Sequence, residues 1–253
     1  MENEVQLLDK AASRPFSDGW VWIKKAFGLS QECAGKWLLM SVIMCLCIGL
    51  CGFFLYDVPI NILREFIALF LLLSFTGGLV VSMASLIEED DLATSYLFAG
   101  FQYKFLQLLF LSICVILISG VFNGLGYMIL MAVGINIMTL AVIAPILFFI
   151  SFSISWLALP LMMLQDIKPL TAIKMSFLGS LKNILPILCA FLIFILAIGG
   201  FVMLIISLAD ILSDRTVSKI RFLVLVLLLT VPIINAAFMY VGYRNIWTNE
   251  PME

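Results

Sequence analysis

The chain contains no histidine, and only 12% of its 253 residues are charged. The absence of histidine excludes Ser-His-Asp and Cys-His catalytic centres, histidine-based zinc sites and a histidine pH switch. The 14 basic and 16 acidic residues give a net charge of −2, without the basic excess typical of nucleic-acid binding. Hydrophobic residues make up 64% of the chain, against about 45–50% in soluble domains. We therefore expect a membrane protein with no nucleic-acid partner.

Long apolar runs make up much of this sequence. A stretch of about 18 or more such residues predicts a transmembrane helix, because about 20 residues cross the hydrocarbon layer. Six spans are predicted: 37–55, 66–87, two within the uncharged stretch 105–164 with a turn around 123–136, 184–208 and 222–243. The predicted fold is all-α, a polytopic integral membrane protein of about six transmembrane helices with short amphipathic interfacial helices.

The basic residues are distributed unevenly between the two sides of this predicted topology. One side, which includes both termini, carries ten of them and the other carries four, and cytoplasmic loops are enriched in such residues. The fifth loop argues against this assignment, because it lies on the side with fewer basic residues and yet contains Arg215, Lys219 and Arg221. We expect a multi-pass protein of the bacterial inner (cytoplasmic) membrane, with a cytoplasmic segment at 1–36, a six-helix domain at 37–243 and a short cytoplasmic tail at 244–253. No signal-peptide pattern precedes the first span, which we expect to be retained.

Three segments outside the spans have an amphipathic pattern: 17–28, 91–101 and 166–179. Each contains an acidic residue near its start and then apolar residues at helical spacing, which predicts a helix in the headgroup plane. Each also reaches a glycine and then a lysine: Gly28 and Lys36, Gly100 and Lys104, Gly179 and Lys182. We interpret this as a threefold repeat of one interfacial helix and two spans. Independent amphipathic linkers are the open alternative.

Aromatic and basic residues on the predicted cytoplasmic side form candidate membrane-interface anchors. Indole rings favour the headgroup level, and lysines near it attract anionic lipids. The predicted anchors are Trp20, Trp22, Lys24, Lys25, Trp37 and Trp247. A partner-binding role for the first amphipathic segment is the alternative.

No charged residue falls near the middle of a predicted span, which disfavours a proton-coupled transporter. Small residues at four-residue spacing predict close helix packing, and the candidates are Ser74, Gly78, Ser82, Gly120 and Gly124. Proline and polar residues within spans can open the backbone toward a cavity or merely bend a helix. The candidates for a solute path are Ser151, Ser155, Pro232 and Asn235.

Other motifs give no indication of catalysis. The six cysteines lack metal-site spacing, so we interpret them as apolar packing residues. The acidic run 88–91 is interpreted as a solvated loop that caps the next helix, with a divalent-ion or basic-partner site as the alternative. No phosphate-binding loop, dinucleotide fingerprint or nucleophile elbow is found. We expect no catalytic residue, metal or cofactor.

Four stretches carry a resemblance to a known family: 19–23 (GWVWI), 97–101 (LFAGF), the linker 166–186 and 240–246 (YVGYRNI). With them the chain resembles a family of uncharacterised proteobacterial inner-membrane proteins. That family is related in architecture to the membrane domains attached to some glycerophosphodiester phosphodiesterases. The resemblance implies a six-helix inner-membrane protein and transfers no catalytic residue.

The expected function is therefore that of a non-enzymatic envelope-associated scaffold or accessory factor. Its expected partners are membrane lipids and another membrane protein or a second copy of the chain. The alternative is a transporter or channel for a small or lipidic solute, and an intramembrane enzyme is the third hypothesis.

Overall fold

The structure, a computed structural model, describes residues 5–56, 58–209 and 214–252, and only the backbone of 198, 201, 202, 204–209 and 214–227. Its helices are α1 (Asp18–Gln31), α2 (Ala34–Phe54), α3 (Asn61–Glu88), the 3-10 helix η1 (Thr94–Phe98), α4 (Ala99–Tyr103), α5 (Phe105–Val133), α6 (Ile137–Ser155), α7 (Ala158–Gln165), α8 (Pro169–Lys182), α9 (Ile184–Ala209) and α10 (Asp214–Trp247). The described part has no β-sheet; one isolated bridge joins Leu7 and Thr248. The fold is all-α, as predicted.

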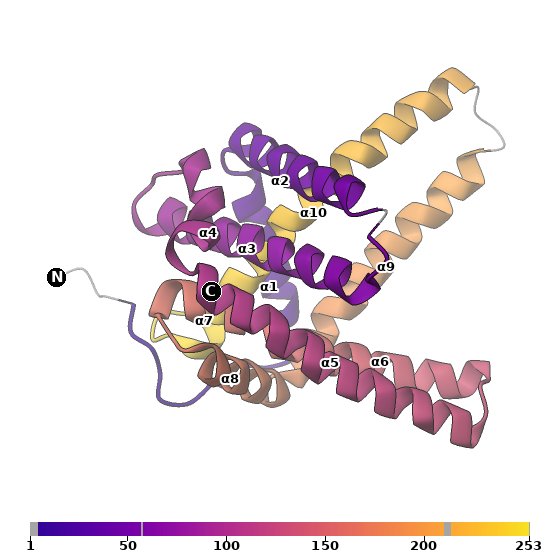
Figure 1. Cartoon of the computed structure of the whole chain (residues 1–253). Helices are drawn as coiled ribbons and strands as arrows, with labels where there is room; N and C mark the ends of the chain where they lie inside the picture. The colour runs from indigo at the N-terminus through magenta and orange to yellow at the C-terminus, as the bar shows by residue number, and fades with distance from the viewer. Residues whose placement is uncertain (1–4, 57, 210–213, 253) are drawn as a thin grey trace.

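The helices form three successive units, each with a short helical segment followed by a long hairpin (Figure 1). The units are α1 with α2–α3, η1–α4 with α5–α6–α7, and α8 with α9–α10. The short segment of each unit packs on the hairpin of the preceding unit. Thus η1–α4 lies on α2–α3, α8 lies on α5–α6–α7, and α1 closes the circle by packing on α9 and α10. This cyclic packing supports the repeat that the spacing of the amphipathic segments predicted.

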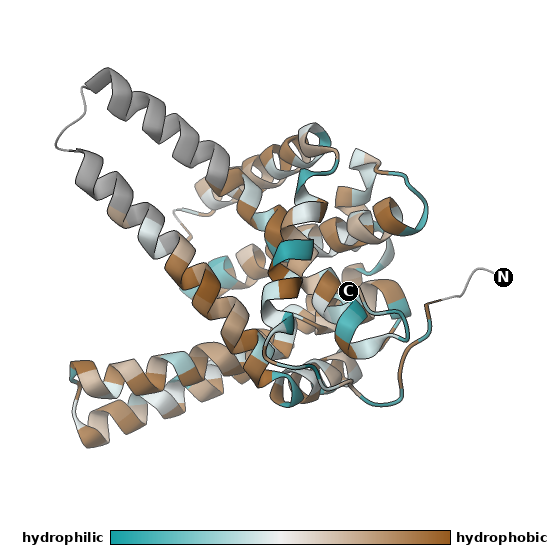
Figure 2. Ribbon diagram, turned by 180° about the vertical axis from the view of Figure 1, so that it is seen from behind, coloured by the Kyte–Doolittle hydropathy of each residue, from teal (hydrophilic) through white to brown (hydrophobic). Residues whose placement is uncertain are grey.

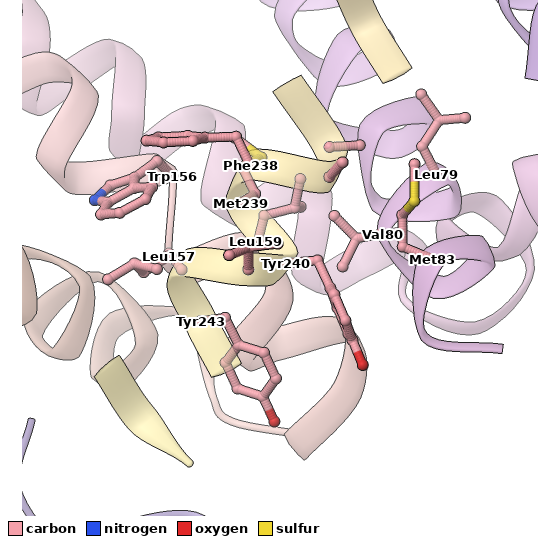
Figure 3. Close-up of a cluster of buried hydrophobic side chains, with 14 of the residues drawn as sticks. Leu79, Val80, Met83, Trp156, Leu157, Leu159, Phe238, Met239, Tyr240 and Tyr243 are labelled. Atoms are coloured by element: carbon pink, nitrogen blue, oxygen red, sulfur yellow. The ribbon is translucent and has the colours of Figure 1, made fainter. Parts of the chain in front are cut away.

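The second arms of the three hairpins meet at the centre of the molecule, where α3, α7 and α10 contact one another. Figure 3 shows side chains from all three arms turned toward this centre. Among them are Leu79 and Met83 of α3, Leu159 of α7 and Tyr240 of α10, each 0% exposed. Full burial of such a side chain contributes about 1.5–3 kcal/mol where the alternative is water. This central cluster fixes the three units relative to one another.

Away from this cluster the hairpins α5–α6 and α9–α10 project and diverge (Figure 1). Among the residues coloured in Figure 2, the strongly hydrophilic ones are concentrated at the compact end, while α5–α6 is mostly hydrophobic. Among the described residues four helical stretches are long and apolar enough to cross a membrane: Ala34–Phe54, Asn61–Glu88, Phe105–Val133 and Ile137–Gln165. The molecule is thus a polytopic membrane protein.

The fifth and sixth predicted spans are only partly described. A candidate fifth span joins α8 to residues 184–197 of α9 across a bend of 81°. The predicted sixth span, 222–243, includes side chains that lie outside the described residues, as do those of Arg215, Lys219 and Arg221. Within the predicted cytoplasmic segment 1–36, the helix α1 packs on α9 and α10.

Candidate functional site: the interfacial collar

The three short helical segments and the chain leading into them form a ring at the compact end, which we call the collar. It comprises α1, η1–α4 and α8 with the lead-in segments 5–17, 89–93 and 166–168. The three lysines singled out by the repeat each join neighbouring units of this ring. Nζ of Lys36 donates to the carbonyl of Leu92 (2.8 Å), Lys104 pairs with Asp166, and Nζ of Lys182 donates to the carbonyl of Ala11 (2.6 Å). Each lysine therefore holds the segment that precedes the next short helix around the ring.

The last of these junctions, between the third unit and the first, is made by the chain termini. The last carbonyls of a helix have no partner within it, and here the N-terminal segment supplies donors to them. The amides of Leu8 and Ala12 donate to the carbonyls of Trp247 and Ile246, both at 2.8 Å. Nε of Arg14 donates to the carbonyl of Asn245 (2.8 Å). The two terminal segments therefore lie on the same side of the molecule.

Asn183, between α8 and α9, completes this junction. Its Oδ1 accepts from the amide of Arg14 (2.8 Å), and its Nδ2 donates to the carbonyls of Ala12 and Gly179, both at 2.9 Å. The side chain is fully buried. The sequence analysis missed its role, and its place directly after the repeat lysine Lys182 is the only signal that pointed to it.

Beneath the collar, Arg244 of α10 is buried among acidic and phenolic groups. Its Nη1 lies 3.2 Å from Oε1 of Glu88, at the end of α3, and 2.8 Å from the hydroxyl of Tyr240. Its Nη2 lies 3.4 Å from Oε2 of Glu250. A buried guanidinium needs such partners to offset its desolvation. Arg244 thus joins α3, α10 and the C-terminal segment, and its charge is compensated within the protein.

The break between α6 and α7 is stabilised by a serine from the collar. In a continuous helix the amide of Leu157 would donate to the carbonyl of Ser153, four residues earlier. Instead the hydroxyl of Ser176 on α8 accepts from the Leu157 amide (3.1 Å) and donates to the Ser153 carbonyl (2.7 Å). Insertion of a side chain into the backbone hydrogen bonds of a helix is a known cause of a kink. Ser180 of the same helix accepts from the indole nitrogen of Trp156 (2.6 Å).

The ion pair of the second junction is exposed on its acidic side. Asp166 is 77% exposed, whereas the Lys104 side chain is 16% exposed. The hydrogen bond from Lys104 and the charge of its ammonium lower the pKa of Asp166 below its ordinary value. Asp166 is thus ionised over the physiological pH range.

The predicted interface anchors divide into two groups. Trp20 is 56% exposed, and Lys24 is exposed with Lys25 half-buried. The prediction is wrong for Trp22, Trp37 and Trp247, which are 0%, 0% and 4% exposed and so cannot reach lipid headgroups. The Trp22 ring centroid lies 6.4 Å from that of Trp156 and 6.2 Å from that of Phe238, inside the protein.

The predicted small-residue contacts also divide. Ser74, Gly78 and Ser82 are buried on α3, and a Cβ at position 78 would lie 2.1 Å from the Leu97 carbonyl oxygen of η1. These three residues of α3 therefore face the collar. Among the described residues nothing lies within 4 Å of a Cβ at Gly120 or Gly124, so these two glycines make no close helix contact there and their packing role stays a prediction. Gly126 makes the close contact between α5 and α6 instead, against Leu147.

The candidate solute-path residues lie on two helices, α6 and α10. Ser151 and Ser155 are half-buried on α6, which packs on α5 and α8. Asn235 is exposed on α10, and its Nδ2 lies 4.0 Å from the sulfur of Met239 on the same helix. Pro232 is half-buried one turn before it. The end of α6 lies next to α10, since the Trp156 and Phe238 ring centroids are 5.5 Å apart; whether these residues line one path stays a prediction.

Within the described residues no group of three or more Cys, Asp or Glu side chains is placed to hold a metal ion. The acidic residues 89–91 are exposed, with Glu89 accepting from Ser85 (3.2 Å) and Asp91 from Tyr96 (3.2 Å).

Comparison with known proteins finds no matching family model, no matching curated protein and no matching solved structure.

Proposed function

We propose that this chain is a non-enzymatic scaffold or accessory factor of the bacterial inner membrane, which contacts lipids and a membrane partner through its projecting hairpins. The observation that carries this proposal is the contrast between the collar and the hairpin α5–α6. The collar lysines Lys36, Lys104 and Lys182 are used in bonds within the protein. The projecting hairpin instead exposes large apolar side chains, among them Leu117 (64%), Leu125 (51%) and Val142 (62%). The resemblance to proteobacterial inner-membrane proteins agrees with this assignment.

The proposed orientation has both termini in the cytoplasm. The distribution of basic residues supports it, and so does the direct bonding between the N-terminal segment and the end of α10. A single cysteine at position 215, introduced into a variant lacking the six native cysteines, tests the orientation in intact cells. We expect a membrane-impermeant maleimide to label it from outside the inner membrane. Labelling from the cytoplasmic side only would contradict the proposed topology.

The proposed contact surface is testable with a photo-crosslinking amino acid at position 125, on the exposed face of α5. The matched control is position 111 of the same helix, where Leu111 is fully buried. We expect crosslinks from position 125 to lipid or to one defined membrane protein, identified by mass spectrometry, and crosslinks from position 111 only within the chain. Equal crosslinking of external molecules from both positions would contradict the proposal. Saturable solute flux in reconstituted vesicles, lost in Asn235→Leu, would favour the transporter alternative.

A further inference from the structure

Apart from Lys10 in the N-terminal lead-in segment, the lysines at the collar fall into two groups that differ in how their charge is used. Lys36, Lys104 and Lys182 bond to neighbouring units, as described above. Four others, Lys24 and Lys25 on α1 and Lys168 and Lys174 at α8, have no hydrogen bond or ion pair within the described residues. Lys24, Lys168 and Lys174 are exposed, and Lys25 is half-buried. This second group, which we call the free lysines, carries positive charge that no group in the described part of the chain neutralises by direct contact.

The free lysines lie on one side of the ring. The end of α8 adjoins the approach to α1, because the Arg14 amide donates to Oδ1 of Asn183 (2.8 Å). The short segment of the second unit, η1–α4, contains no lysine and follows the exposed acidic residues 89–91. Asp18 and Glu32 are the acidic residues at the two ends of α1. The collar therefore carries the four free lysines along α1 and α8 and exposed carboxylates at the start of the second unit.

Exposed apolar side chains accompany the free lysines on both helices. On α1, Trp20 is 56% exposed and Phe27 is 52% exposed, while on α8 Leu170 is 62% exposed and Leu178 is 49% exposed. A helix that combines lysines with exposed aromatic or aliphatic residues binds in the headgroup plane, with its apolar groups at the acyl boundary. Lysine stems can lie along apolar surface while their ammonium groups reach phosphates.

We propose that the α1–α8 side of the collar binds the headgroups of anionic phospholipids, and that the acidic side at 89–91 does not. The proposal rests on the proposed function only in placing the collar at the surface of a lipid leaflet. It adds a lipid class and an asymmetry around the ring. Attraction between lysines and an anionic leaflet decreases within a Debye length, about 10 Å at 0.1 M salt, so the preference depends on salt.

The test uses the full chain in nanodiscs that contain phosphatidylcholine and phosphatidylglycerol in equal amounts. The protein is released by native mass spectrometry, and the ratio of the two lipids retained on it is measured. We expect enrichment of phosphatidylglycerol in the wild-type protein. The variant Lys24→Gln/Lys25→Gln/Lys168→Gln/Lys174→Gln should lower that enrichment about fivefold or more, since lysines near an anionic surface attract its lipids.

The matched variant Glu89→Gln/Asp90→Asn/Asp91→Asn removes charges from the opposite side of the ring and should retain or increase the enrichment. A third variant, with arginine at the four lysine positions, should also retain it, which separates loss of charge from loss of folding. Free inorganic phosphate at millimolar concentration should not displace the lipid, because the apolar contacts belong to the acyl boundary. Unchanged enrichment in the glutamine variant, or an equal loss in the acidic-side variant, would overturn the proposal. Either result would leave the crosslinking result at position 125 intact and so would not affect the proposed scaffold function.

Discussion

The collar end and the projecting ends of the hairpins differ in how much of each helix is buried and in which groups hold the helices together. The C-terminal half of α3 reaches the collar, and 61% of the residues in the apolar 18-residue stretch of α3 are buried in the protein. In the corresponding stretches, the buried share is 22% for α5 and 11% for the span that begins with α6. At the collar end, buried hydroxyl, amide and guanidinium groups join the units to one another. At the end of the α5–α6 hairpin, apolar side chains are exposed, and Gly126 contacts Leu147 within the hairpin.

This difference indicates where the stability of the fold resides. In a bilayer, apolar helix surfaces gain little by leaving lipid, so helix association depends on close packing and hydrogen bonds. Those features are concentrated at the collar end. We therefore expect substitutions there to destabilise the protein more than chemically matched substitutions in the projecting hairpin.

The largest expected difference is between Gly78→Ala and Gly120→Ala. A Cβ at position 78 would lie 2.1 Å from a backbone oxygen and 2.5 Å from a backbone carbon of Leu97, so η1 would have to move. We expect this change to lower the unfolding free energy by about 3 kcal/mol or more, because overpacking against backbone leaves little room for relaxation. Gly120→Ala should leave stability unchanged or slightly raised. Thermal unfolding in detergent measures both, and equal melting temperatures would contradict the comparison.

A smaller effect is expected from Ser176→Ala, compared with Ser119→Ala on α5. Loss of the Ser176 hydroxyl leaves the amide of Leu157 and the carbonyl of Ser153 without their bridging partner at the α6–α7 break. A buried group left unsatisfied costs about 1–3 kcal/mol. Ser119 is half-buried on the projecting hairpin, and its substitution should cost under about 0.5 kcal/mol. Amide hydrogen exchange at residues 153–160 should increase in the first variant alone; an unchanged exchange pattern would show that the bridge does not stabilise the break.

Next comes the pair Asn183→Ala and Asn123→Ala. The Asn183 amide bonds to the N-terminal segment at Ala12 and Arg14, whereas Nδ2 of Asn123 bonds to Ser119 within α5. We expect Asn183→Ala to cost about 1–2 kcal/mol and to release residues 5–16 to limited proteolysis. Asn123→Ala should change neither quantity. Equal protease resistance of the two variants would contradict the role of Asn183.

The smallest expected effect is a pH dependence at the second junction. The pKa of Asp166 is lowered by Lys104, so the stabilisation from this pair is present above the ordinary carboxyl value of 3.8 and is lost as pH falls through the lower folded value. Asp166 is exposed, and the effect should be small. In Lys104→Met the pKa of Asp166, measured by NMR of carboxyl-labelled protein, should rise toward 3.8, whereas Lys174→Met should not move it. If Lys104→Met left the pKa of Asp166 unchanged, the ion pair between Lys104 and Asp166 would be excluded in solution.

The fold class could be predicted from the sequence because length and apolar composition determine whether a helix can cross a membrane. The spans around α2, α3, α5 and α6–α7 and the three short segments were predicted on this basis. The repeat was indicated by the spacing of Gly100 and Gly179 and by the three lysines. Gly28 proved not to take part, since nothing lies within 4 Å of a Cβ there, and Gly19 makes the close contact of α1 with α9.

The burial of individual residues could not be predicted in the same way. A helix face toward lipid and a face toward protein are both apolar, so Trp20 and Trp22 look alike in sequence although their exposures differ by 56 percentage points. The roles of Ser176 and Asn183 depend on partners 19–23 and 169–171 residues away. Such distant pairings leave no local pattern. This is why the polar bonds of the collar were missed while its helices were predicted.

The junction between the two chain ends has a consequence for biosynthesis. Residues 5–14 and α1 find their partners in α9, α10 and the C-terminal segment, which are synthesised after the first two hairpins. The contact between Arg14 and Asn245, for example, spans 231 residues. Contacts of such separation form late in folding. Until the third hairpin has been inserted, the face of α1 that carries Trp22 lacks its partners on α9 and α10, Phe238 among them, and part of its apolar surface is not yet covered by the protein.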